Sequence, residues 1–151
     1  MMLLKVSCAL DARHWRRPLE GKVVHVATEG SGALSGTRIL IVEDEAMIAL
    51  LLQNMVTDLG CIVAAWAKST VEALAFISTG EAFDAALLDL LLNGETALPI
   101  AAALDQRGIP FVVTTGFDDP VVLSRFAGHV ILQKPIEQAD LERALLSLKK
   151  V

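Results

Sequence analysis

The chain has 151 residues, of which 54% are hydrophobic, and a formal net charge of −5. High apolar content with modest net charge excludes a chain that is disordered throughout, and the length suits one domain. Residues 1–36 carry five Lys or Arg against three acidic residues, whereas residues 37–151 carry eight against fifteen. This acidic body argues against binding a nucleic-acid backbone and suits a protein that binds a divalent cation.

The first 36 residues differ from the rest in composition. Residues 22–28 ("KVVHVAT") are compatible with a short strand, and residues 29–36 ("EGSGALSG") have the composition of a flexible linker. We expect an N-terminal extension over 1–36, either a loosely attached arm or upstream sequence added by a wrong start codon. No apolar run reaches the roughly 18–20 residues that span a bilayer, and no secretory signal is evident. Cys8 and Cys61 lack metal-ligand spacing, and nothing in the sequence implies an oxidising compartment. Because neither a membrane span nor a secretory signal is evident, we expect a cytoplasmic protein without membrane contact.

From Thr37 onward, apolar stretches alternate with helical patterns. Strands are predicted over residues 37–43, 61–67, 83–89, 109–116 and 129–134. Helices are predicted over 44–60, 69–80, 96–108 and 135–150, with a weak or short helix over 118–128. Ser69 with Glu72 forms an N-terminal capping pattern, and Pro99 falls in a first turn, where proline is tolerated. Met47 and Met55, eight residues apart, are expected on one buried helix face.

The predicted strands are apolar throughout instead of alternating. This is typical of parallel strands whose two faces are both covered by helices. We therefore predict an α/β fold over residues 37–151, a doubly wound five-stranded parallel sheet with strand order 2-1-3-4-5. In such sheets, ligands bind at the carboxyl ends of the strands, near the switch point between strands 1 and 3.

Polar residues stand at the carboxyl ends of four neighbouring predicted strands. They are Glu43 and Asp44 at strand 1, Asp89 at strand 3, Thr114 and Thr115 at strand 4, and Lys134 at strand 5. Carboxylates that lie together raise one another's pKa, and a cation that prefers oxygen ligands, Mg²⁺ or Mn²⁺, removes the conflict. Lys134 adds a positive charge and Thr115 a hydroxyl. The combination predicts a site for a phosphoryl group, in which Asp89 attacks phosphorus as a nucleophile.

Four segments in order, "ILIVEDE", "ALLDLLLNGE", "VVTTG" and "LQKP", resemble the receiver domain of bacterial two-component response regulators. The resemblance covers residues 37–151 and implies the flavodoxin-like or CheY-like version of the predicted fold. It implies that Asp89 is the phosphoacceptor. It also implies that Asp44 ligates Mg²⁺ directly and Glu43 through water. The backbone carbonyl of Leu91 would be a further ligand.

The same resemblance assigns roles to residues around the phosphoacceptor. Thr115 would swing toward the phosphoryl group, Lys134 would pair with its oxygen, and Pro135 would follow a cis peptide bond. Leu91 and Phe117 occupy positions that tune the dephosphorylation rate in this family. The aromatic switch residue of the family would fall at Ile131, and the chain has no tyrosine. The usual coupling of the threonine to an aromatic side chain is therefore not expected.

The chain looks most similar to a subgroup of stand-alone receivers known from α-proteobacteria. These carry a Phe-Ala-Thr-Gly motif after strand 4, where this chain reads "VVTTGFDD", and act in stress signalling with particular histidine kinases. The implied function is a single-domain response regulator, phosphorylated by a sensor histidine kinase or phosphotransfer protein. The chain ends after the last helix, so we expect signalling to a downstream partner protein without DNA binding. Family members also pair as homodimers through helix 4, strand 5 and helix 5.

Two other functions stay open. A pseudo-receiver would keep the fold as a binding module without phosphotransfer, although the intact set of Asp44, Asp89, Thr115 and Lys134 argues against it. A Mg²⁺-dependent phosphatase with an aspartyl nucleophile would need a second acid two residues after Asp89, and Leu91 stands there. We therefore expect a signalling protein that is not an enzyme, apart from phosphorylating and dephosphorylating itself.

Overall fold

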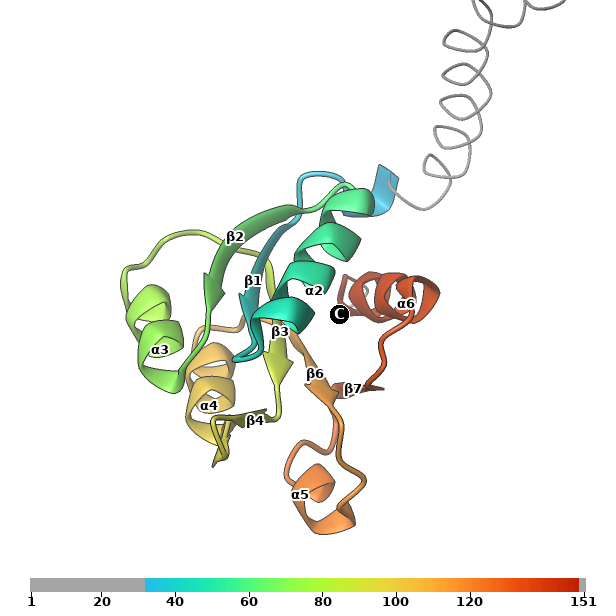
Figure 1. The fold of residues 1–151 in the computed structure, drawn as a ribbon. Coiled ribbons are helices and arrows are strands. Elements are labelled where there is room, and N and C mark those ends of the chain that lie inside the picture. Colours follow the sequence, from blue (N-terminus) through green and yellow to red (C-terminus); the bar gives the residue numbers. More distant parts are fainter. Residues whose placement is uncertain (1–31, 150–151) are drawn as a thin grey trace, which may run out of the picture.

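Five parallel strands form the central sheet of the computed structural model, which describes residues 32–149 (Figure 1). They are β1 (Arg38–Val42), β2 (Ile62–Ala67), β3 (Ala85–Asp89), β6 (Phe111–Thr115) and β7 (Val130–Gln133). Their order is β2-β1-β3-β6-β7, and each neighbouring pair is parallel. The predicted doubly wound sheet with order 2-1-3-4-5 is confirmed, because these are the five predicted strands in chain order. The stretch 22–28, expected to suit a strand, lies outside the described residues.

Helices cover both faces of this sheet (Figure 1). α2 (Ala46–Asp58) and α6 (Gln138–Leu148) pack on one face, and α3 (Thr70–Ser78) and α4 (Leu98–Gln106) on the other. Every residue of the central strands β3 and β6 is buried, as continuous apolar strands require. Because all five strands are parallel, their carboxyl ends lie at one edge of the molecule. Between residues 32 and 149, no helix has the length and apolar character needed to cross a membrane.

Local signals in the sequence account for the helix starts. The Ser69 hydroxyl accepts a hydrogen bond from the backbone N–H of Glu72 at 3.1 Å, as the capping pattern predicts. Pro99 lies in the first turn of α4, as predicted. The helix predicted to be weak or short is α5 (Pro120–Ser124), only five residues long, with Asp119 accepting from the N–H of Val121 at 2.9 Å.

The structure contains a small hairpin that the sequence interpretation missed. Strands β4 (Leu91–Leu92) and β5 (Glu95–Thr96) pair antiparallel directly after β3. Their two-residue turn has positive φ at both positions, 52° at Asn93 and 81° at Gly94. Asn-Gly is the dipeptide that most favours such a turn, so the signal was present in "LLNGE".

Two other expectations need correction. Met47 is 78% exposed, so the buried face predicted for Met47 and Met55 is wrong for Met47. The helix instead turns Ala49, Leu52 and Val56 toward the core, spaced at three and four residues. The linker expected over residues 29–36 also differs at Leu34, which is fully buried in the core between the sheet and the layer of α2 and α6.

Candidate functional site

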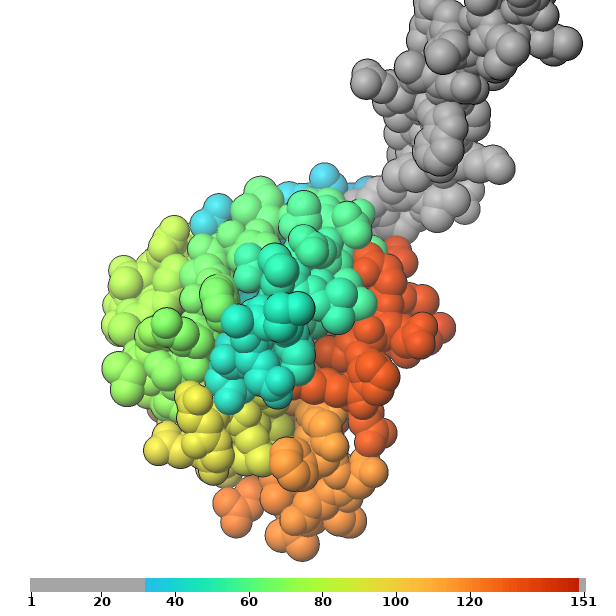
Figure 2. All heavy atoms as spheres, in the orientation of Figure 1, coloured from blue at the N-terminus to red at the C-terminus, as the bar shows by residue number. Residues whose placement is uncertain are grey.

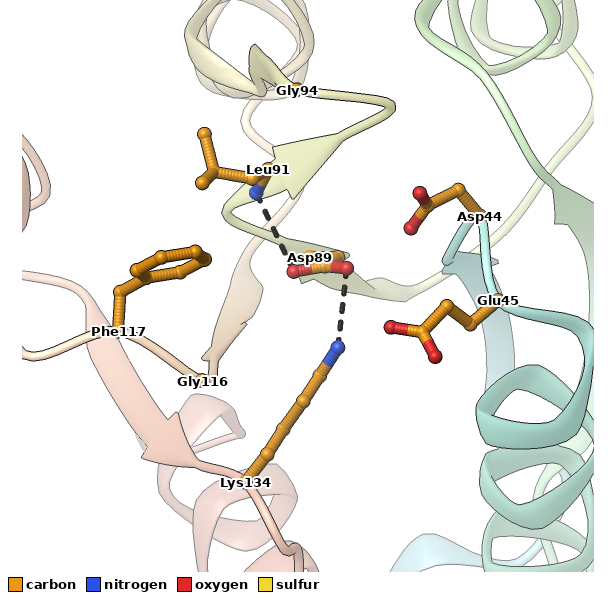
Figure 3. Close-up of a pocket in the computed structure, with 8 residues that line it drawn as sticks. All are labelled: Asp44, Glu45, Asp89, Leu91, Gly94, Gly116, Phe117 and Lys134. Carbon is orange, nitrogen blue, oxygen red and sulfur yellow. Dashed lines mark hydrogen bonds and ion pairs between the residues drawn. The ribbon is translucent and has the colours of Figure 1, made fainter.

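Charged side chains from three strands meet at the carboxyl edge of the sheet. Glu43 directly follows β1, Asp89 ends β3, and Lys134 directly follows β7. The Lys134 Nζ atom lies 2.8 Å from Glu43 Oε2 and 3.1 Å from Asp89 Oδ2 (Figure 3 shows the second contact). Residues far apart in the sequence are thus brought into direct contact because parallel strands end at one edge.

Burial determines the electrostatics of this cluster. The Glu43 side chain is fully buried, and burial raises its pKa from 4.5 to about 7, against the opposing effect of its hydrogen bond to Lys134. Burial also raises the pKa of Asp89, again opposed by Lys134. Burial alone would lower the pKa of Lys134, but the two carboxylates more than offset this and raise it. The site therefore holds more negative charge than one lysine balances.

The raised pKa of the buried Glu43 predicts how stability depends on pH in the absence of divalent cations. Folded Glu43 binds a proton with a pKa of about 7, whereas an unfolded glutamate does so near 4.5. The unfolding free energy should therefore fall as pH rises from 5 to 8, by roughly 2 kcal/mol from this group. Urea unfolding in EDTA at several pH values measures the slope. Glu43→Gln should flatten it, and an equally steep slope in that variant would show that Glu43 is not the cause.

A cleft of about 280 Å³ opens above these charges. Its lining residues are Asp44, Glu45, Asp89, Leu91, Gly94, Gly116, Phe117 and Lys134. The acidic side chains of Asp44 and Glu45 form one wall, and the apolar side chains of Leu91 and Phe117 form the opposite wall (Figure 3). Glu45, for which no role in the site was predicted, is the N-cap residue of α2, and its carboxylate faces the cleft.

The acidic residues fit a divalent cation. One carboxylate oxygen each from Glu43, Asp44 and Asp89 lies within 4.8 Å of the others. Oxygen donors at this density suit a hard cation such as Mg²⁺. Both Glu43 oxygens already accept hydrogen bonds, from Lys134 and from the N–H of Glu45 at 3.1 Å. Contact through water therefore suits Glu43 better than direct ligation.

Thr115, like the fully buried Glu43 and Thr114, is a predicted site residue that does not line the cleft. Its hydroxyl accepts a hydrogen bond from the backbone N–H of Phe117 at 2.9 Å, and the residue is 1% exposed. The threonine is therefore held by a hydrogen bond within its own loop in this conformation.

The expected cis peptide bond between Lys134 and Pro135 is present.

A five-stranded parallel sheet with a carboxylate cluster and a lysine at its carboxyl edge defines a receiver-type signalling domain. The sequence matches the family described as response regulator receiver domain over residues 39–146. The chain belongs to this family and is a receiver domain of a two-component system. The resemblance inferred from the four sequence segments is thereby confirmed.

Several solved structures are similar to this chain. The solution structure of SdrG from Sphingomonas melonis Fr1 is 40% identical, covers 76% of this chain and 97% of its own, and has a TM-score of 0.68. The solution structure of the BeF3-activated conformation of SdrG from Pseudomonas melonis Fr1 is 38% identical in sequence. The match covers 78% of this chain and 98% of the SdrG chain, with a TM-score of 0.65. The crystal structure of the response regulator PhyR from Brucella abortus is 27% identical in sequence. The match covers 85% of this chain and 53% of the PhyR chain, with a TM-score of 0.67. No curated protein matches the sequence.

Proposed function

We propose that this chain is a single-domain response regulator in which Asp89 accepts a phosphoryl group from the phosphohistidine of a sensor histidine kinase or phosphotransfer protein. The observation that supports this best is the position of the Asp89 carboxylate, at the base of an open cleft and 3.1 Å from the Lys134 ammonium. A nucleophile, a cationic partner and a candidate cation site occur together there, as phosphoryl transfer requires.

The chemistry assigns a task to each group in the cleft. An Asp89 oxygen attacks phosphorus while the phosphorus–nitrogen bond of the donor histidine breaks, leaving an acyl phosphate on Asp89 and a free imidazole. Asp44, Asp89, the Leu91 carbonyl and, through water, Glu43 would hold Mg²⁺, which neutralises the phosphoryl oxygens when bound. Lys134 pairs with one of those oxygens after leaving Asp89.

Thr115 is the residue proposed to report phosphorylation. Because Thr115 is buried and does not line the cleft, its hydroxyl would have to turn toward the cleft to donate to a phosphoryl oxygen, and this would disturb its hydrogen bond with the N–H of Phe117 and the loop before α5. A downstream partner protein would then read the altered surface.

Pairing of two copies through α5, β7 and α6 is a further part of this proposal. The proposal also divides the chain into an N-terminal extension over residues 1–36 and a receiver domain over residues 37–151.

The direct test is phosphorylation by a small donor. The purified chain is incubated with acetyl phosphate and Mg²⁺, and its intact mass is recorded. We expect the mass of one phosphoryl group to be added, with no addition in EDTA, and peptide mapping to locate it on the segment that contains Asp89. An unmodified chain that also fails to bind beryllofluoride would instead favour the pseudo-receiver, a binding module without phosphotransfer.

An exposed apolar surface beside the cleft supports docking of a protein donor. Met47, Leu50 and Leu51 are 78%, 53% and 49% exposed in the first turns of α2, which begins just after Asp44. In Figure 2 the start of α2 (teal) lies at the molecular surface, beside the yellow region that contains the hairpin. A phosphohistidine that reaches Asp89 must bring its protein over this rim, where apolar side chains would be buried.

Met47→Glu should therefore weaken transfer from a protein donor. We expect about a tenfold slower phosphorylation by a histidine kinase that phosphorylates the wild type, because a charge would be buried at the contact. Phosphorylation by acetyl phosphate should be unchanged. Val71→Glu is the matched control, since Val71 is also 78% exposed but lies on α3. Equal slowing in both variants would contradict docking on α2.

A further inference from the structure

The tip of the β4–β5 hairpin contacts the ends of two strands of the main sheet. The backbone N–H of Asn93 donates a hydrogen bond to Asp44 Oδ2 at 3.1 Å. The side-chain Nδ2 of Asn93 donates to the carbonyl oxygen of Lys68 at 3.3 Å. Because Asp44 follows β1 shortly after its end and Lys68 directly follows β2, one residue connects three segments that are distant in the sequence.

The residue type suits this position for two reasons. Asn93 has a φ of 52°, a left-handed conformation that asparagine tolerates better than most residues. Its short side chain also carries an NH₂ donor, which reaches the Lys68 carbonyl. Leu92, the residue directly before Asn93, is 1% exposed and anchors the hairpin in the core. The tip is thus held from the core on one side and by the Asn93 amide on the other.

The carboxylates of the cluster are held in different ways. Glu43 and Asp89 both contact Lys134, which balances part of their charge. Among residues 32–149, the hydrogen-bond donor to the Asp44 carboxylate is the neutral N–H of Asn93. A neutral donor fixes the position of a carboxylate but leaves its full negative charge available to a cation. Asp44 is therefore oriented without being neutralised.

We propose that Asn93 is a positioning residue for the cation site, holding the hairpin tip against Lys68 and so fixing the Asp44 carboxylate beside Glu43 and Asp89. The inference rests on the proposed function, because it assumes that this cluster binds a divalent cation. It predicts that the Asn93 amide, which lies outside the set of cation ligands, contributes to cation affinity through Asp44.

The test is the Mg²⁺ affinity of Asn93→Gly in the full chain. Glycine accepts a positive φ, so the turn can be kept while the amide contact to Lys68 is lost. We expect about threefold to tenfold weaker Mg²⁺ binding, the effect of losing one hydrogen bond that orders a ligand. Trp66 is the optical reporter, because its Nε1 donates to the carbonyl oxygen of Glu43 at 2.8 Å. Trp15→Phe serves as the background, and calorimetry provides an independent affinity.

Two controls separate the possible results. Glu95→Gln alters an exposed residue of the same hairpin and should leave the affinity unchanged. A wild-type chain that binds no Mg²⁺ would overturn the proposed function together with this inference. Wild-type binding with equal affinity in Asn93→Gly would overturn the positioning role alone and leave the proposed function standing.

A second measurement does not depend on any Asn93 variant. The Asn93 amide proton should exchange with solvent slowly in the wild type and faster in Asp44→Ala, because its acceptor is removed. Unchanged exchange of this amide would show that Asp44 and Asn93 are not coupled and would likewise overturn the positioning role.

Discussion

Asp89→Asn is expected to abolish phosphorylation completely, with acetyl phosphate or with a protein donor. The amide of asparagine is not a nucleophile toward phosphorus, and it also removes one anionic oxygen ligand from the candidate cation site. Among the carboxylates that line the cleft, the one in contact with the Lys134 ammonium is that of Asp89 (Figure 3), so we expect neither Asp44 nor Glu45 to replace it as the acceptor. Intact mass after incubation with acetyl phosphate and Mg²⁺ measures the effect.

The fold should survive this substitution. Asparagine has the shape of aspartate, and Lys134 keeps Glu43 as its partner at 2.8 Å. Removing one of two buried carboxylates relieves their repulsion, so the thermal midpoint without cation should equal or exceed that of the wild type. Asp58→Asn, at the exposed end of α2, should accept the phosphoryl group normally. A phosphoryl group on Asp89→Asn would place the acceptor elsewhere and contradict the proposed role.

Lys134→Met is expected to have the largest effect on stability. The methionine fills a similar volume but leaves the buried carboxylates of Glu43 and Asp89 without a cationic partner. Breaking a buried ion pair from one side costs about 3 kcal/mol or more, so the unfolding free energy in EDTA at pH 8 should fall by about that amount. Urea unfolding followed by circular dichroism provides the measurement.

The loss should depend on pH in a defined direction. Without Lys134, both carboxylates bind protons more readily, so lowering the pH neutralises them and restores stability. The difference between wild type and Lys134→Met should therefore shrink from pH 8 toward pH 5. Lys68→Met removes an exposed lysine and should change stability little. A loss that stays constant across this pH range would point to lost packing and not to uncompensated charge.

Most of the site could be predicted from where polar residues interrupt apolar stretches. Asp89 ends a strand buried at every position, and Lys134 directly follows another strand. Once the strands are parallel and in the order 2-1-3-4-5, their carboxyl ends share one edge, so these side chains must converge. The contacts of Lys134 with Glu43 and Asp89 follow from that topology.

Other features of the site depend on local geometry that residue patterns do not specify. The Asn-Gly pair indicates a turn, but not that the Asn93 N–H reaches Asp44. Likewise, a threonine at a strand end is compatible with a hydroxyl in the cleft or, as observed, bonded to the N–H of Phe117. Met47 was assigned to the buried face because its spacing from Met55 is helical, but spacing alone does not say which side of a helix faces the sheet.

By itself, the sequence determined the α/β class, the parallel order of the strands and the edge at which the acidic residues and the lysine gather. These depend on apolar periodicity and on the handedness of crossovers, which are properties of short segments and of their order. The tertiary structure alone decided that Glu43 is buried enough to raise its pKa to about 7, that Glu45 faces the cleft, and that the hairpin reaches Asp44. Burial and hydrogen bonding between distant segments depend on distances of a few ångströms, which only the packed chain establishes.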